Sequence, residues 1–573
     1  MGAEQDTQGD RAGADIVGRH KRLFGRTALI SGMTLVSRLL GFVREFLAAA
    51  LFGDRSTIYD AFVTAWRVPN LFRRLLGEGA VSTALQTALT EADGDHGEAA
   101  GRALFWSTIR IASVLLVAVC VVLIGGVALM GDTMPLTGWH WLGEDPEPVR
   151  DLMGRLAPFV VFICLAALMG GALAVRGRFV GWSAGPGVMN VVAIGTLVAL
   201  GLIYGWTGPG PSDGVEGRMR HLEMVRVFAW ALVISGVLQI LILVPELVAV
   251  GLLGRRGAPL AGDPGARATG AGTGGGWGVL RSSLPLALGA AVYQVNVMVD
   301  GFMAQGLLPA GGPTTYYFAN RVQQFPLALV ATAATSAVFP ALKALGHRGA
   351  LPELRRLHHR THFAICFLAL PATAGLLALS TPIVAALFGH GEFGPAGVDR
   401  TAGALAILSL GLVPAGAVGL VSRTYYALGD FRTPVRVSIG ALFLNLVLNV
   451  VFLVGVGMDV RGLALATVLT GWANLVWLLP GLLRQLSSGE TPQEPLEGRG
   501  TLIRMLVAAG VCGGVAYAAQ RAAAPWLGEI PGLAVAIALS VTVYALMTKL
   551  LGVSNLVRRG SRFGGPDGPG GSV

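Results

Sequence analysis

The chain has 573 residues, of which 53% are hydrophobic and only 13% are charged. Globular proteins carry about 25% charged residues, so this composition excludes an ordinary soluble protein of the same length. The net charge of +10 would also suit a nucleic-acid-binding protein, but the cations flank or interrupt apolar stretches. That placement favours a membrane protein with no nucleic-acid partner.

Residues 1–26 form a polar tail with a basic cluster that includes Arg19, Lys21 and Arg26. The tail contains no apolar core followed by a small-residue cleavage site, so we expect no signal peptide. Basic residues beside an apolar stretch favour the cytoplasmic side of a membrane, and we therefore place this tail in the cytoplasm.

Apolar stretches follow one another from about Thr27 to Leu551, separated by short clusters of Gly, Pro and charged residues. Since a membrane-spanning helix needs about 20 mostly apolar residues, the sequence predicts an all-α polytopic membrane protein with about 14 transmembrane helices. No room remains for a separate soluble domain. The predicted spans lie near 27–51, 60–90, 103–130, 152–174, 186–206, 225–253, 281–306, 314–341, 361–388, 400–428, 433–456, 462–483, 501–521 and 531–551.

Lys and Arg alternate between the connections, as the positive-inside rule requires. The basic connections lie near 176–178, 255–281 and 343–360 and after 551, whereas 306–314 contains no Lys or Arg. Both termini are therefore predicted to be cytoplasmic.

A short internal sequence repeat suggests that the chain has two halves. The run Ala65-Trp-Arg-Val68 is similar to Ala319-Asn-Arg-Val322, six predicted spans later. An even number of spans predicts parallel repeats, although matches this short also arise by chance. We expect an N-terminal lobe over 27–253, a Gly-rich cytoplasmic linker over 254–280, a C-terminal lobe over 281–485, two further helices within 486–551 and a disordered cytoplasmic tail over 552–573.

Polar residues in the first span recur at three- and four-residue steps, which places them on one helix face. They include Ser37, Arg38, Arg44 and Glu45. Because an arginine at the bilayer centre costs about 2.5–3.5 kcal/mol, this face should look onto protein or a watery cavity. The alternative is that Arg44 and Glu45 lie near the end of the span and reach the membrane surface.

The second span carries the most polar side chains. These are Asp60, Arg67, Asn70, Arg73, Arg74 and Glu78. Pro69 removes a backbone donor in the middle of the span, so we expect the helix to bend there. The alternative is an amphipathic helix on the membrane surface, which the flanking spans disfavour.

The seventh and eighth spans repeat this pattern. The seventh contains Gln294, Asn296 and Asp300, and the eighth contains Asn320 and Arg321. Polar amides can simply join helices, so for Gln294 and Asn296 a structural role is as well supported as a substrate contact. Arg321 differs, because a guanidinium binds phosphate through paired hydrogen bonds and stays charged in a low dielectric.

Arginines outnumber carboxylates among these candidates. The arginines are Arg38, Arg44, Arg67, Arg73, Arg74 and Arg321, and the carboxylates are Glu45, Asp60, Glu78 and Asp300. A cavity lined by them would be net positive, which predicts an anionic ligand such as a pyrophosphate.

Three runs in these spans resemble motifs of the MurJ (MviN) lipid II flippase family. They are Ser37-Arg-Leu-Leu-Gly-Phe-Val-Arg44-Glu45, Arg67-Val-Pro-Asn-Leu-Phe-Arg73-Arg74 and Tyr316-Tyr-Phe-Ala-Asn-Arg321. The resemblance extends from about Gly25 to Gly481. It implies a bacterial plasma-membrane flippase of the multidrug/oligosaccharidyl-lipid/polysaccharide exporter superfamily. Two six-helix lobes would surround a cationic cavity, and two C-terminal helices would border a groove for the lipid tail.

The resemblance also implies roles for individual residues. Those whose family counterparts are important are Ser37, Arg38, Arg44, Asp60, Arg73, Arg74, Glu78 and Arg321. Arg67 and Asn70 belong to the same predicted substrate site, with Glu45, Gln294, Asn296, Asp300 and Asn320 as secondary candidates. Asn320 is a departure, because the family usually has an acidic residue before this arginine. The long Gly-rich linker is unusual as well.

The expected substrate is therefore lipid II, an undecaprenyl-pyrophosphate-linked disaccharide peptide, handled by a monomer surrounded by membrane lipids. Alternatives are an exporter of another polyprenyl-linked glycan or of a cationic drug, although a drug exporter should carry an acidic cavity. A membrane enzyme acting on polyprenyl phosphates is disfavoured, since the sequence has no phosphate-binding glycine loop and no metal-ligand cluster. We expect no cofactor, and we expect all four cysteines to be buried apolar residues.

Overall fold

The computed structural model describes residues 32–77, 80–129, 140–206, 214–253, 275–329, 333–487 and 499–553. All regular secondary structure in this part of the chain is helical, so the all-α prediction is confirmed. The predicted N-terminal tail, most of the predicted linker, nearly all of the C-terminal tail and the candidate Glu78 lie outside the described residues.

The helices group into two compact units. Unit 1 takes its described residues from 1–51, 65–130 and 147–290, and unit 2 takes them from 52–64, 131–146 and 291–573. The division falls inside two helices. It crosses α2 (Thr57–Phe72) after Thr64 and α9 (Gly275–Leu307) after Ala290.

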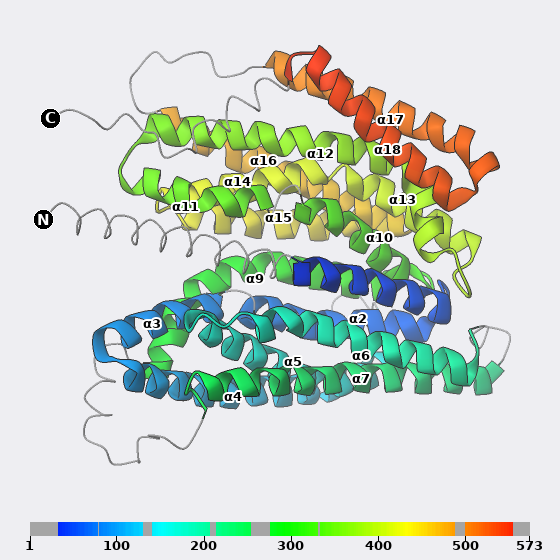
Figure 1. The fold of residues 1–573 in the computed structure, drawn as a ribbon. Helices are drawn as coiled ribbons and strands as arrows, with labels where there is room; N and C mark the ends of the chain where they lie inside the picture. Colours follow the sequence, from blue (N-terminus) through cyan, green and yellow to red (C-terminus); the bar gives the residue numbers. More distant parts are fainter. Residues whose placement is uncertain are drawn as a thin grey trace, which may run out of the picture. The chain divides into compact units, whose positions relative to one another are not determined.

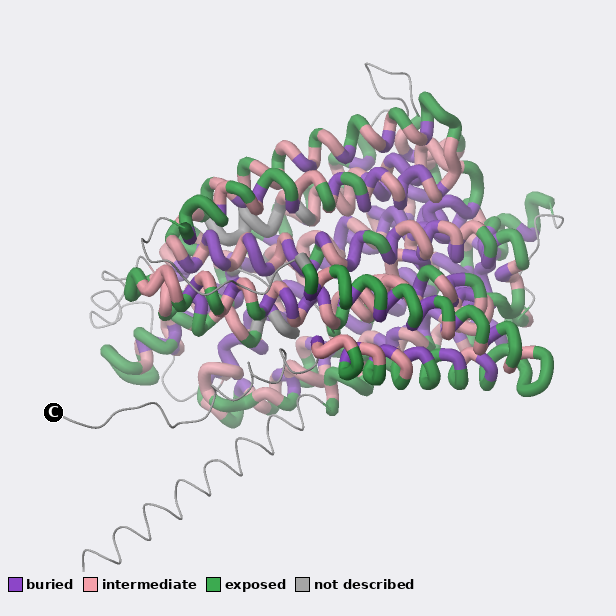
Figure 2. Tube along the Cα trace, turned by 90° about the horizontal axis from the view of Figure 1, so that it is seen from above, coloured by how far each residue is buried: buried purple, intermediate pink, exposed green. Residues whose placement is uncertain are grey.

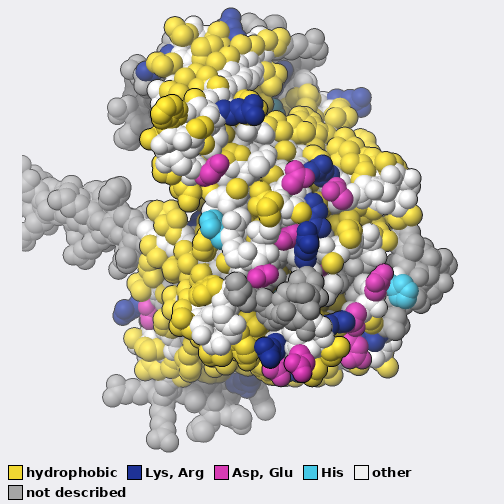
Figure 3. Space-filling model, turned by 90° about the vertical axis from the view of Figure 1, so that its right-hand side faces the viewer, with side chains coloured by type: hydrophobic (Ala, Val, Ile, Leu, Met, Phe, Trp, Pro, Cys, Tyr) yellow, Lys and Arg dark blue, Asp and Glu magenta, His cyan; other side chains and the backbone are white. Residues whose placement is uncertain are grey.

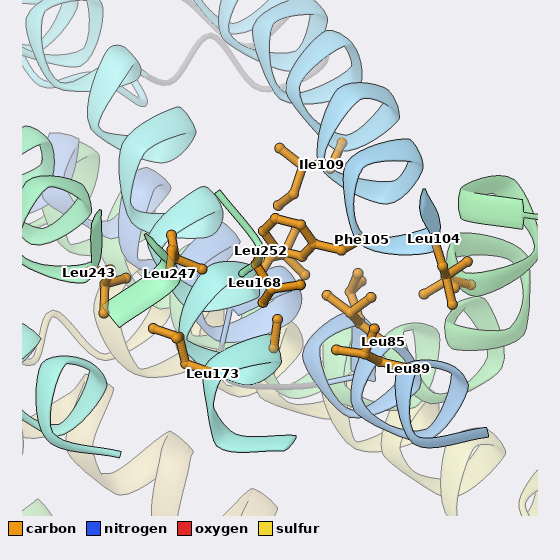
Figure 4. Packing of buried hydrophobic residues seen from close by; sticks show 14 of the residues in the cluster. Leu85, Leu89, Leu104, Phe105, Ile109, Leu168, Leu173, Leu243, Leu247 and Leu252 are labelled. Atoms are coloured by element: carbon orange, nitrogen blue, oxygen red, sulfur yellow. The ribbon is translucent and has the colours of Figure 1, made fainter. Parts of the chain in front are cut away.

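Unit 1 has its core among the helices that follow α2. It holds most of the helix over 32–52, the second half of α2, the π-helix η1 (Arg73–Gly77), α3 (Ala80–His96), α4 (Glu98–Leu129), α5 (Glu147–Val175), α6 (Val180–Tyr204), α7 (Gly214–Ala249) and the first half of α9 (Figure 1). Leu89 of α3, Phe105 of α4 and Leu168 of α5 meet in this core, together with Leu247 of α7 (Figure 4). Burial of these large apolar side chains packs the helices against one another.

Unit 2 continues from the second half of α9. Its further helices are α10 (Gly312–Leu327), α11 (Ala333–His347), α12 (Leu351–Phe388), α13 (Pro395–Ser409), α14 (Leu412–Ala427), α15 (Arg432–Val450) with the π-helix η3 (Val451–Gly455), α16 (Val460–Ser487), α17 (Arg499–Leu527) and α18 (Glu529–Leu550). The last two helices pack on each other and on α12, where Cys366 and Met505 share one core cluster and Cys512 and Tyr544 share another.

Nine described helices are long and apolar enough to cross a membrane, and the bent pair α13 and α14 could form a tenth span. Many of their large apolar residues face outward: Val122 of α4 is 70% exposed and Leu202 of α6 is 75% exposed. Buried and exposed residues alternate along the helices (Figure 2), and hydrophobic side chains cover large areas of the face in Figure 3. The protein is therefore a multi-pass membrane protein.

The predicted total of fourteen spans stays a prediction, although each predicted span contains helix. The four predicted spans that do not meet the length and hydropathy criterion share one property. They are the helix over 32–52, α2 with η1 and α3, α9, and α10 with α11, and together they carry every candidate site residue that the structure describes. α2, α3, α10 and α11 have 16, 17, 16 and 15 residues, so each of these helices alone is shorter than the about 20 residues that a span needs.

Candidate functional site

The candidate site residues of the helix over 32–52 differ in how far they are buried. Ser37 is half-buried and Arg38 is exposed, whereas Arg44 and Glu45 are 7% and 2% exposed. The Arg44 guanidinium forms an ion pair with the Glu45 carboxylate and also donates to Oδ1 of Asn190 in α6, at 3.2 Å. Nδ2 of Asn190 donates to the Ser37 carbonyl at 2.8 Å. The amide of Asn190 therefore binds both Ser37 and Arg44, which lie two turns apart on the same helix, to α6.

The second half of α2 and the π-helix η1 that follows it bear the densest group of candidate arginines. Pro69 lies inside the helix, and the π-helix η1 begins at Arg73, immediately after α2 ends. Nε and Nη2 of Arg73 both donate to Oδ1 of Asn70, at 3.3 and 2.9 Å. Arg67 and Arg74 are half-buried nearby in sequence. The sequence predicted a bend at Pro69, and α2 continues through this proline to Phe72. The π-turn that follows was not predicted, and such turns often mark functional sites.

Asp60 caps α10. It is 3% exposed, and its Oδ2 accepts the Gly311 N–H at 2.6 Å. Its Oδ1 accepts both the N–H and the hydroxyl of Thr314, at 3.0 and 2.6 Å. Gly311 is the N-cap residue of α10 and has no side chain to cap the helix itself, so Asp60 supplies the carboxylate that favours a helix N-terminus.

The capped helix α10 carries two further candidates. Asn320 and Arg321 are half-buried, and Nε2 of Gln324 donates to Oδ1 of Asn320 at 3.0 Å. Asn320 thus engages a neighbouring amide one turn away. Because Asn320 is neutral, the position next to Arg321 adds no negative charge.

Asp300 of α9 belongs to a buried polar cluster. Its Oδ1 accepts from Nδ2 of Asn449 at 2.8 Å, and its Oδ2 accepts from the Thr467 hydroxyl at 3.4 Å. Nδ2 of Asn449 also donates to Oδ1 of Asn445, one turn earlier in α15, at 3.0 Å. Gln294 and Asn296 are half-buried on the same helix as Asp300. Neither Asn445 nor Asn449 was predicted from the sequence, although their four-residue spacing within an apolar span indicates a shared helix face.

The structure distributes the candidates over both units. Unit 1 holds Ser37, Arg38, Arg44, Glu45, Arg67, Asn70, Arg73 and Arg74, and unit 2 holds Asp60, Gln294, Asn296, Asp300, Asn320 and Arg321. Unit 1 therefore supplies most of the cationic candidates, and unit 2 supplies the carboxylates of Asp60 and Asp300 with Arg321. A common cavity for all of them stays a prediction. The described residues contain no His, Cys, Asp and Glu group suited to a metal ion.

Curated proteins related to this chain are described as lipid II flippases. A relative from Vibrio cholerae described as "Probable lipid II flippase MurJ" is 32% identical over 488 residues, which cover 81% of this chain and 83% of the relative. A Burkholderia cenocepacia protein described as "Lipid II flippase MurJ" is 30% identical over 468 residues, covering 81% of this chain and 84% of that protein.

Solved structures share the fold. The structure described as "Lipid II flippase MurJ, inward closed conformation" has a TM-score of 0.68 at 20% identity and covers 91% of this chain and 98% of its own. An inward-facing multidrug resistance MATE family transporter of the MOP superfamily has a TM-score of 0.59 at 13% identity, covering 79% of this chain and 96% of its own.

Long helices with apolar outer faces, and arginines within several of them, define a multi-pass α-helical membrane protein. The family described as "Lipid II flippase MurJ" matches residues 48–531. With this match and relatives at 30% identity or above, the chain belongs to the lipid II flippase MurJ family.

Proposed function

We propose that this protein moves lipid II from the cytoplasmic to the outer leaflet of the bacterial plasma membrane, and so supplies peptidoglycan synthesis. The match of residues 48–531 to the lipid II flippase family carries this proposal. The protein is a transporter and not an enzyme. Its task is to bring a pyrophosphate and a sugar head group across an apolar layer, where an uncompensated charge is costly.

The arginines supply the matching chemistry. Arg38 is exposed, and Arg73 and Arg321 are half-buried, so all three guanidinium groups are at least partly accessible. Guanidinium groups bind phosphate oxygens through paired, charge-assisted hydrogen bonds. We therefore assign the pyrophosphate to these side chains, while the undecaprenyl tail stays in lipid. Alternating exposure of this site to the two sides of the membrane would move the head group.

Arg321→Lys tests this assignment together with the function. We expect wild-type protein to bind lipid II and the lysine variant to bind about tenfold more weakly, because an ammonium keeps the charge but cannot form two parallel hydrogen bonds. The measurement is lipid II binding by purified proteins at matched amounts. Asn320→Asp is the matched neighbour: it restores the acidic residue usual in the family, and it should weaken binding only modestly.

Two results would contradict this scheme in different ways. Wild-type affinity in Arg321→Lys would leave the arginine as a counter-ion and remove it from the substrate site. Absence of lipid II binding by the wild type, with binding of another undecaprenyl-linked glycan, would contradict the proposed substrate.

We also propose that both termini are cytoplasmic, as the alternation of basic connections predicts. The four native cysteines are buried, so a membrane-impermeant maleimide should label only introduced cysteines. Ala310 and Arg348 are exposed and lie on predicted opposite sides. We expect Ala310→Cys to be labelled from outside intact cells and Arg348→Cys only after the membrane is opened. The reverse pattern would overturn the orientation.

A further inference from the structure

Residues 52–64 are built into unit 2, while the rest of α2 belongs to unit 1. Aromatic rings provide part of the attachment. The Tyr59 ring stacks on Phe52 with centroids 4.8 Å apart and on Phe318 of α10 at 6.4 Å. The Thr64 hydroxyl donates to Oε1 of Gln305 in α9 at 2.9 Å. If unit 2 moves during transport, the first half of α2 therefore moves with it.

A second attachment lies just before α2, at Asp54. This side chain is 2% exposed. Its Oδ1 accepts the Gly394 N–H at 3.0 Å, and its Oδ2 accepts from Nη2 of Arg400 in α13 at 2.9 Å. Nη1 of Arg400 donates to the Ala310 carbonyl at 3.2 Å. We call Asp54, Ala310, Gly394 and Arg400 the Asp54 junction. The two terminal nitrogens of one guanidinium here bridge two chain segments that are distant in sequence.

Glycines allow the segments to approach this closely. Gly311 has φ of +85°, a left-handed conformation that L side chains rarely adopt. A Cβ at Gly311 would also collide with the backbone oxygen of Asp54, and one at Gly397 in α13 would collide with the Asp54 side chain. The junction is therefore a close-packed arrangement of three segments and not a chance surface ion pair.

The Asp54 junction adjoins the cap of α10. Arg400 holds the carbonyl of Ala310, and Asp60 holds the N–H of Gly311, the next residue. The start of α10 is thus fixed on two sides, by α13 through Arg400 and by α2 through Asp60. Since α10 carries Arg321, any displacement at its start is passed to a helix of the candidate substrate site.

We propose that Arg400 is a positioning residue of the transport cycle, one that fixes the first half of α2 and the start of α10 to unit 2 through the Asp54 junction. The inference rests on the proposed transport function. Arg400 acts through Asp54 and Ala310, without touching the substrate. Because of this attachment, the first half of α2 moves together with unit 2. Its loss should therefore slow flipping and leave lipid II affinity almost unchanged.

The same helix offers a matched control. Asp399 and Arg461 form an ion pair at 2.7 Å whose side chains are 76% and 40% exposed, whereas those of Asp54 and Arg400 are 2% and 23% exposed. Exposed ion pairs contribute little because water and salt screen them. Arg461→Gln removes an arginine of α16 that pairs with α13, without touching the Asp54 junction.

The experiment compares wild type, Arg400→Gln, Arg400→Lys and Arg461→Gln in liposomes, at matched protein amounts. Flipping is measured against lipid II concentration, and the unfolding temperature of each variant is recorded. We expect the maximal rate of Arg400→Gln to fall about tenfold, the effect of one charge-assisted hydrogen bond, with the half-saturating concentration within about twofold of wild type. Arg400→Lys should recover part of the rate, because one ammonium reaches Asp54 but cannot also reach Ala310. Arg461→Gln should match wild type.

Two outcomes would overturn the inference while the proposed function stands. One is a wild-type rate in Arg400→Gln. The other is a parallel loss of rate, affinity and unfolding temperature that lysine does not relieve, which would assign Arg400 to general stability. Absence of flipping by the wild type itself, in the same experiment, would instead contradict the proposed function.

Discussion

Replacement of Asp60 by alanine is expected to abolish flipping and to destabilise the start of α10. The carboxylate accepts hydrogen bonds from two backbone N–H groups and one hydroxyl. The two buried N–H groups left without a partner cost about 1–3 kcal/mol each, so we expect the free energy of unfolding to fall by about 2–6 kcal/mol. Thermal unfolding in detergent and flipping in liposomes measure the two effects.

Thr314→Val is the matched control for Asp60. It removes only the hydroxyl from the same cap, and the Thr314 N–H keeps its bond to Asp60. We expect a loss of about 1 kcal/mol, with measurable flipping. If Asp60→Ala were as stable and as active as Thr314→Val, the carboxylate cap would not be what holds α10.

The second large effect concerns Arg44. Arg44→Ala removes the guanidinium beside Glu45, whose side chain is 2% exposed. Breaking a buried ion pair by removing one partner costs about 3–5 kcal/mol, because the remaining charge is left in a low dielectric. We therefore expect this single substitution to lower the unfolding temperature strongly and to abolish transport.

A double substitution separates the two roles that Arg44 combines. Replacing both charges with apolar residues of similar volume is often nearly neutral for stability, so Arg44→Met with Glu45→Met should recover most of the unfolding temperature. Transport should stay absent, because the predicted substrate site still lacks an arginine. Recovery of flipping in the double variant would contradict a substrate role for Arg44 and leave it as the counter-ion of Glu45.

Local patterns in the sequence were sufficient for much of the fold. Long apolar runs predicted the helices, since a spanning segment must bury nearly every residue in lipid or protein. Arg73 and Arg321 could be singled out because a charged side chain within an apolar helix is costly and therefore informative.

Contacts between distant segments could not be predicted in this way. Asp54 and Arg400 look like ordinary loop and helix-end charges in the sequence, and they meet only because three glycine-containing segments pack together. The asparagines at 445 and 449 also become significant only once α15 lies against Asp300. Hydrophobic periodicity reports which side of a helix is buried, but it does not say which helix covers that side.

Flipping by the purified wild-type protein is the most direct test of the central claim. Liposomes containing this protein would receive lipid II in one series and a different undecaprenyl-linked glycan in another, with protein-free liposomes as the reference. We predict protein-dependent transfer of lipid II between leaflets, and weaker or no transfer of the other glycan. Transfer of lipid II no faster than in protein-free liposomes, by protein shown to be folded, would contradict the assignment.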